Sequence, residues 1–133
     1  MTTIYVSLDA LTVPSEKPDA YLGAGISPYT NGFLHWAATK GKVVLLTDRP
    51  IAQVLALLDR HGCSKLGVQI RTFTSSKTEV LRPTEDFYLV DEVLIPSEYS
   101  WFAEHGLGDR LIPVGSDGVT PATKDKLAAR LKH

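Results

Sequence analysis

Polar side chains follow three apolar runs of this chain, at the point where each run ends. The first run leads into Ser7 and Asp9, the second into Thr47, and the third into Asp91 and Glu92. Residues two apart in a strand point to the same side, so Ser7 and Asp9 project together. Because ligands of open α/β sheets bind at the carboxyl ends of the strands, we expect these groups to converge at one edge.

A lysine at the same edge completes the candidate chemistry. Lys77 lies in the polar segment that follows the third expected strand. A hydroxyl, a lysine and two or three carboxylates together suit a site for phosphate and magnesium. The adjacent carboxylates of Asp91 and Glu92 repel each other unless a cation lies between them, and Lys77 or a metal ion supplies one. The plainer interpretations are that Thr47 and Asp48 cap the following helix and that Lys77 is a solvated surface residue.

The elements that position these residues are read from the spacing of apolar side chains. Unbroken apolar runs predict strands covered on both faces, and apolar residues at helical spacing predict amphipathic helices. We expect strands at residues 4–6, 43–46, 66–73, 87–90 and 111–114. We expect helices at residues 33–40, 50–61, 97–105 and 120–131, with a short helical turn within 74–79.

Several finer features of these elements follow from residue type. Thr30 or Asn31 is expected to cap the first helix, Gly41 to end it, and Ser97 to cap the third. Alternation at 66–73 predicts a strand at an edge or in a half-exposed position, and Pro113 predicts an edge position for the last strand. The second helix is expected to bury a stripe of Ile51, Val54, Leu55 and Leu58.

Alternating strands and helices predict a three-layer α/β, Rossmann-like fold with a mainly parallel five-stranded sheet. The length of 133 residues suits a single domain spanning 1–133. The stretch from 11 to 30 is too short for a separate cap domain and forms at most a flap. Its glycines, Gly23 and Gly25, match neither the dinucleotide pattern nor the P-loop pattern, so we interpret the stretch as a structural loop.

Composition excludes several classes of function. The formal net charge of -1 gives no electrostatic case for binding nucleic acid or an anionic membrane. Cys63 is the only cysteine, so an intrachain disulfide and a multi-cysteine metal site are both excluded. No apolar run is long enough for a membrane span and no signal peptide is evident, so we expect a cytoplasmic protein.

The ordered set of strand-end residues resembles the haloacid dehalogenase (HAD) superfamily of phosphohydrolases, over most of the chain. Four segments carry the resemblance, in the order of the four family motifs. They are Val6-Ser7-Leu8-Asp9-Ala10, Leu45-Leu46-Thr47, Ser75-Ser76-Lys77 and Leu89-Val90-Asp91-Glu92. The resemblance implies a capless HAD-like fold with Ser7, Asp9, Thr47 and Lys77 at the catalytic positions. It also implies a magnesium site that includes Asp9, Asp91 and Glu92.

One position departs from the family pattern. In the family the first aspartate of the first motif is the nucleophile and a magnesium ligand, and here that residue is Ser7. A serine hydroxyl is a poor nucleophile without a base and a poorer magnesium ligand than a carboxylate. Asp9 occupies the family's general acid/base position. The resemblance therefore implies the fold and a weakened magnesium or anion pocket.

Three hypotheses for function follow. The first is a degenerate HAD-like protein without normal phosphatase turnover that binds a phosphorylated ligand or a protein partner. The second is an active, magnesium-dependent capless phosphatase that works by an altered route. The third is an interaction protein that shares only the layered fold, in which case Thr47, Lys77 and Asp91 do not face one pocket.

Overall fold

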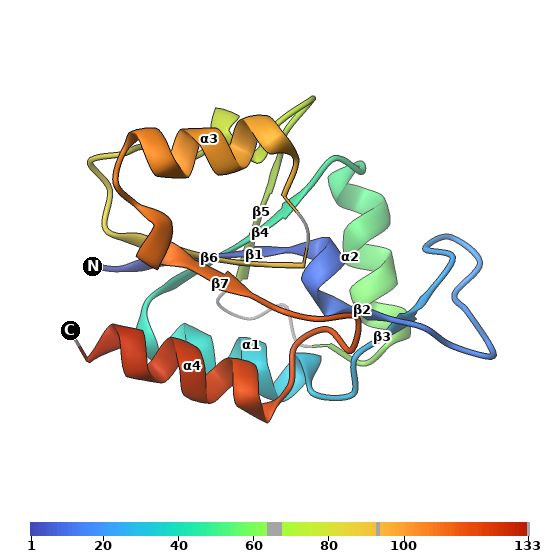
Figure 1. Ribbon diagram of the computed structural model, residues 1–133. Helices are drawn as coiled ribbons and strands as arrows, with labels where there is room; N and C mark the ends of the chain where they lie inside the picture. Colours follow the sequence, from blue (N-terminus) through green and yellow to red (C-terminus); the bar gives the residue numbers. More distant parts are fainter. Residues whose placement is uncertain (64–67, 93, 133) are drawn as a thin grey trace.

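A parallel sheet forms the centre of the protein, as seen in a computed structural model that describes residues 1–63, 68–92 and 94–132. In these ranges the sheet has five strands in the order β5-β4-β1-β6-β7, and every neighbouring pair is parallel (Figure 1). In that order the strands are Val68–Thr72, Lys42–Thr47, Thr3–Ser7, Phe87–Asp91 and Leu111–Pro113. The predicted α/β class and parallel sheet are confirmed, and so are the edge positions of β5 and β7. Residues 66 and 67 of the expected third strand lie outside the described ranges.

Four α-helices accompany the sheet in the described residues: α1 (Thr30–Lys40), α2 (Ile51–Arg60), α3 (Pro96–Glu104) and α4 (Pro121–Leu131). Figure 1 shows α3 above the sheet and α1 and α4 below it. Short 3-10 helices connect the larger elements: η1 (Leu8–Leu11), η2 (Lys77–Glu79) and η3 (Gly108–Arg110). Within the described ranges, no helix has both the length and the apolar character that crossing a membrane requires.

Alternation along the strands divides the core into two layers. Ile4 and Val6 pack with side chains of α1, α2 and α4, whereas Tyr5 packs with Phe102 of α3 on the opposite face. Because successive strand residues point to opposite faces, strands buried on both sides need apolar residues at every position. The unbroken apolar runs of the sequence meet that need, and the result is three layers.

Two predicted helix caps are wrong. The residue that caps α1 is Tyr29, which makes no side-chain capping bond, and Thr30 is already the first helical residue and is buried. The residue that precedes α3 is Ile95 instead of Ser97, because Pro96 starts this helix and the Glu98 carboxylate accepts the Ile95 backbone N–H at 3.0 Å. Proline fits the first turn of a helix because its missing N–H has no intrahelical partner there. The predicted termination of α1 at Gly41 is confirmed.

The segment between β1 and α1 is more ordered than the expected loop. It contains a two-stranded antiparallel pair, β2 (Thr12–Val13) and β3 (Gly25–Ile26). Asp19 ties its tip to the end of α2, since its carboxylate is 3.1 Å from the Arg60 guanidinium and 3.1 Å from His61 Nε2. These contacts hold the pKa of the Asp19 carboxyl below its ordinary value, with Arg60 as the largest cause. The segment is thus a flap anchored to the domain.

The predicted stripe of α2 is wrong at two of its four positions. The buried residues are Val54, Leu57 and Leu58, whereas Ile51 and Leu55 are 44% and 36% exposed. The helix contacts the sheet beside the edge strand β5, so only a narrow face of it is covered.

This face gives a matched test of packing. We expect Leu57→Ala to lower the free energy of unfolding by about 2–5 kcal/mol, since it leaves a cavity in a fully buried position. Leu55→Ala removes the same atoms from a partly exposed position of the same helix and should cost less than about 1 kcal/mol. Urea denaturation of both variants measures the difference, and equal losses would contradict the observed orientation of α2.

Candidate functional site

Three of the predicted site residues end adjacent strands at one edge of the sheet. Ser7 is the last residue of β1, Thr47 the last of β4 and Asp91 the last of β6. Both β4 and β6 pair in parallel with β1, which lies between them. The sequence-based expectation that these strand ends share one edge is therefore confirmed.

Ser7, Asp91 and Lys77 form a buried polar cluster, which we call the Ser7 cluster. Lys77 Nζ lies 2.7 Å from Asp91 Oδ2, and the Ser7 hydroxyl is near enough to that carboxyl group to favour its charged form. The three residues are only 1%, 2% and 6% exposed in the order Ser7, Asp91 and Lys77. A hydroxyl, a carboxylate and an ammonium thus meet in a nearly dry environment.

Strand register explains why these residues meet. Val6 is the partner of Val90, so Ser7 and Asp91 are the next residues of two neighbouring strands. Tyr5 and Leu89, which precede Ser7 and Asp91 by two, pack on the α3 side of the sheet. By alternation Ser7 and Asp91 face that side too, where η2 contacts α3 and supplies Lys77.

Burial has the largest effect on the pKa of the Asp91 carboxyl group. Loss of solvent raises the pKa of its carboxyl group above the ordinary value, against the opposing effects of Lys77, the Ser7 hydroxyl and the Glu92 backbone N–H. That N–H donates to Asp91 Oδ1 at 2.8 Å. A buried carboxylate is tolerated when it is paired and hydrogen-bonded. Asp91 has a hydrogen bond at Oδ1 and an ion-pair partner at Oδ2, but Oδ2 accepts no hydrogen bond from the described residues.

A second buried carboxylate positions Lys77. Glu98 of α3 is 2% exposed, and its Oε2 accepts the Lys77 backbone N–H at 2.6 Å while Oε1 accepts that of Ile95. One side chain therefore joins the start of η2 to the start of α3. Sequence analysis missed Glu98. Glu98 is the third residue after Ile95, and a carboxylate at this position of a helix commonly accepts a backbone N–H. This spacing is the signal that could have identified Glu98.

Glu79 organises the segment that leads into Lys77. Its carboxylate accepts the backbone N–H groups of Thr74, Ser75 and Ser76 at 3.0, 2.9 and 2.8 Å. These hydrogen bonds lower the pKa of Glu79 from 4.5 to about 2, because they favour the charged form. The expected short helix within 74–79 is the 3-10 helix η2, and Ser76 caps it through the Thr78 backbone N–H.

Of the other predicted site residues, Thr47 faces away from the Ser7 cluster, whereas Asp9 and Glu92 contact it through their backbone N–H groups. Thr47 follows Leu46, which packs on the α3 side, so alternation directs Thr47 to the opposite face of the sheet. Its Oγ1 accepts the Arg49 backbone N–H at 3.0 Å, in the turn before α2. The plainer prediction that Thr47 and Asp48 cap this helix is wrong, because the N-cap residue is Pro50 and no side chain caps it. Asp9 is exposed, and its backbone N–H donates to Ser7 Oγ at 3.2 Å. Glu92 is half-buried.

The residues present do not fit the magnesium site that the resemblance implies. Among the described residues, no three His, Cys, Asp or Glu side chains lie close enough together to hold a metal ion, so Asp9, Asp91 and Glu92 do not form the expected set. Asp91 is the one carboxylate of the Ser7 cluster, and Lys77 already offsets its charge. Magnesium requires near-octahedral oxygen ligands, which a hydroxyl and one paired carboxylate do not supply.

The Lys77–Asp91 pair gives the first prediction for the site. Lys77→Met leaves Asp91 buried without its counter-charge, and we expect a loss of about 3–5 kcal/mol in the free energy of unfolding. The double variant Lys77→Met/Asp91→Leu should recover most of that loss, because replacing both charges removes the desolvation penalty. Lys126→Met, at an exposed lysine, is the control. A single variant as stable as the control would refute the pairing.

The lowered pKa of Glu79 predicts a pH dependence of stability. The contribution of Glu79 is fully present above pH 4.5, the value without these bonds, and is lost as the pH falls toward 2. Glu79→Gln should flatten this part of the curve of unfolding free energy against pH. The exposed Glu16→Gln should leave the curve unchanged. Urea midpoints at pH 3 and pH 6 measure the effect, and parallel curves for wild type and Glu79→Gln would contradict it.

Comparison with known protein families and curated proteins does not assign a function to this chain. No model of a known protein family matches the chain. No curated protein matches it either. The residues of the Ser7 cluster and their order along the chain therefore carry the functional argument.

Proposed function

We propose that this chain is a HAD-like domain that has lost normal phosphatase turnover and acts by binding a phosphorylated ligand or a protein partner. The observation that carries the proposal is the Ser7 cluster itself. A serine holds the place where the family's motif has its nucleophile, and it lies beside a lysine and an aspartate that follow in the family's order.

The net charge of the Ser7 cluster supports the proposed loss of phosphatase turnover. With serine at position 7 the cluster contains one ammonium and one carboxylate, so it is neutral as a unit when Asp91 is ionised. A second carboxylate at position 7 makes the cluster negative and gives it a reason to bind a cation. The cluster in this chain therefore has little affinity for magnesium, and the electrostatic stabilisation on which phosphoryl transfer depends is absent from it.

The burial of Ser7 supports the same proposal. Attack on phosphorus requires the nucleophile to reach the substrate at about 3–3.5 Å. Ser7 is 1% exposed, and its Oγ accepts the Asp9 backbone N–H at 3.2 Å. Ligand binding at this edge therefore involves the exposed Asp9 and the rim around it.

One observation favours an altered phosphatase route as the second candidate. The Ser7 hydroxyl lies near the Asp91 carboxyl group, whose Oδ2 has no hydrogen-bond donor among the described residues and would be the base for the serine proton. The 1% exposure of Ser7 and the pairing of Asp91 with Lys77 weigh against this route, because the base is occupied and the nucleophile is covered.

A Ser7→Asp variant tests the proposal, with Ser7→Asn as an uncharged control of the same size. We expect wild type and Ser7→Asn to show no shift in melting temperature with millimolar magnesium and no hydrolysis of an aryl phosphate. Ser7→Asp should gain magnesium affinity by about tenfold or more, because two carboxylates then face one ammonium. Circular dichroism of each variant establishes that it is folded.

The outcomes separate the candidates. Magnesium-dependent hydrolysis by the wild type that disappears in Asp9→Asn would overturn the proposal in favour of the phosphatase. Inorganic phosphate that perturbs the backbone amide signals of Ser7 and Asp9 identifies the ligand as phosphorylated. Unchanged signals at millimolar phosphate identify a protein partner instead.

A further inference from the structure

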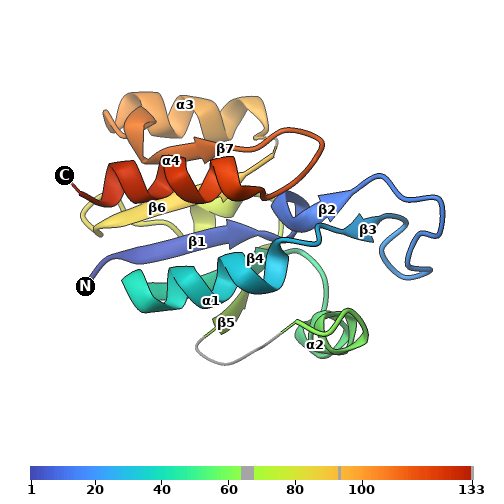
Figure 2. The same ribbon diagram turned by 90° about the horizontal axis from the view of Figure 1, so that it is seen from below.

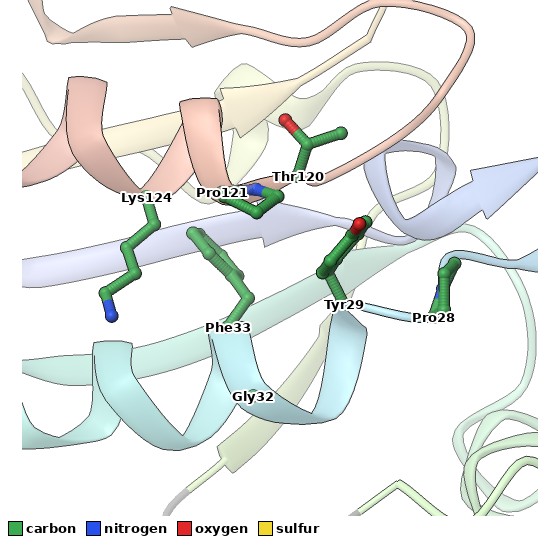
Figure 3. Close-up of a pocket in the computed structure, with 7 residues that line it drawn as sticks. All are labelled: Pro28, Tyr29, Gly32, Phe33, Thr120, Pro121 and Lys124. Carbon is green, nitrogen blue, oxygen red and sulfur yellow. The ribbon is translucent and has the colours of Figure 1, made fainter.

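Two cavities lie between α1 and α4 on the face of the sheet opposite to the Ser7 cluster, and we call the two together the α1/α4 groove. The two helices lie side by side in both views of the fold (Figures 1 and 2). One end of this α1/α4 groove is a cavity of about 320 Å³ beside the first turns of the two helices (Figure 3). The other end is a cavity of about 290 Å³ lined by Trp36, Lys40 and Lys132.

The floor of the groove is apolar and well packed. Phe33 is 3% exposed and packs against Trp36 with ring centroids 6.0 Å apart, and Tyr29 is 50% exposed at the first end. Figure 3 shows Tyr29 and Phe33 projecting from α1 into the space beside Pro121 of α4. A cavity of this size accepts one large apolar side chain of a ligand.

The rim of the groove is basic. Lys124 lines the first end, and Lys40 and Lys132 line the second, whereas no acidic residue of the described chain lines either end. Helices α1 and α4 with Lys132 hold five of the 14 Lys and Arg residues but one of the 15 Asp and Glu residues. Of these five residues Lys40, Lys124 and Lys132 line the groove, so its rim carries three positive charges.

We propose that the α1/α4 groove binds an acidic amphipathic helix of a partner protein. Apolar side chains of that helix enter the two cavities, and its carboxylates face Lys40, Lys124 and Lys132. Helix α1 has 11 residues and is about 16 Å long, so the groove accommodates about three turns of a partner helix.

The aromatic rings favour a helix over single-stranded nucleic acid. Bases bind to such surfaces by stacking on open aromatic faces. Here Lys124 Nζ lies 5.6 Å from the centroid of the Trp36 ring and Phe33 is buried. Tyr29 is therefore the one exposed aromatic ring among the lining residues, and a single ring does not stack successive bases. A basic rim around an apolar cavity suits a chain with both carboxylates and apolar side chains.

The test uses a fluorescein-labelled amphipathic peptide of about 15 residues, with leucine along one face and glutamate elsewhere, long enough to form a helix when bound. Fluorescence anisotropy with the full chain should show binding that weakens as salt rises, because the charges lie at an exposed rim. Lys124→Glu should weaken binding about tenfold or more. Gly32→Leu should also weaken it, because Gly32 lines the first cavity and has open space beside it.

Lys126→Glu is the matched control, because Lys126 lies on the same helix but lines a different cavity beside Pro113. It should change the affinity less than about twofold, and an effect equal to that of Lys124→Glu would overturn the proposal. Binding of a single-stranded oligouridine without binding of the acidic peptide would overturn it too. Ser7→Asp should bind the peptide like the wild type, so failure of this proposal and failure of the proposed function are distinguishable.

Discussion

The ion pair between Lys77 and Asp91 is the contact on which the arrangement of the α3 layer depends. Taking a carboxylate out of water costs several kcal/mol, and a lysine at 2.7 Å offsets that cost only if its backbone is held in place. Glu98 supplies this restraint by accepting the Lys77 backbone N–H while it begins α3. The polar end of β6 therefore determines where η2 and α3 meet, and apolar packing by Phe102 completes the layer.

The two faces of the sheet are used differently. Side chains of α1, α2 and α4 pack on one face into an apolar core that extends to residues of η1 and β4. The other face is covered by α3 and the segment around η2, and its core ends at the buried Ser7 cluster. The sheet lies between the Ser7 cluster and the α1/α4 groove. We therefore expect a substitution in one of the two sites to leave the other unchanged.

Sequence patterns predicted the strands well because a strand covered on both faces requires an unbroken apolar run, as at residues 43–46. They also predicted that Lys77 and Asp91 meet. The contact of Glu98 with Lys77 was less predictable, since Glu98 accepts a backbone N–H that is 21 residues away in sequence. Thr47 was misplaced for a different reason. It is one residue beyond Leu46, the register partner of Ser7, and one residue is enough to turn a side chain to the opposite face.

The identity of residue 7 decides what the cluster is able to do. A carboxylate there gives two negative charges around one ammonium, and the deficit of positive charge favours a bound cation or a proton. A hydroxyl adds no charge beside Asp91, and its oxygen accepts the Asp9 backbone N–H. The same backbone geometry thus holds one ammonium and one carboxylate in this chain. Because this pair is buried, recognition of a ligand depends on exposed neighbours of the cluster such as Asp9.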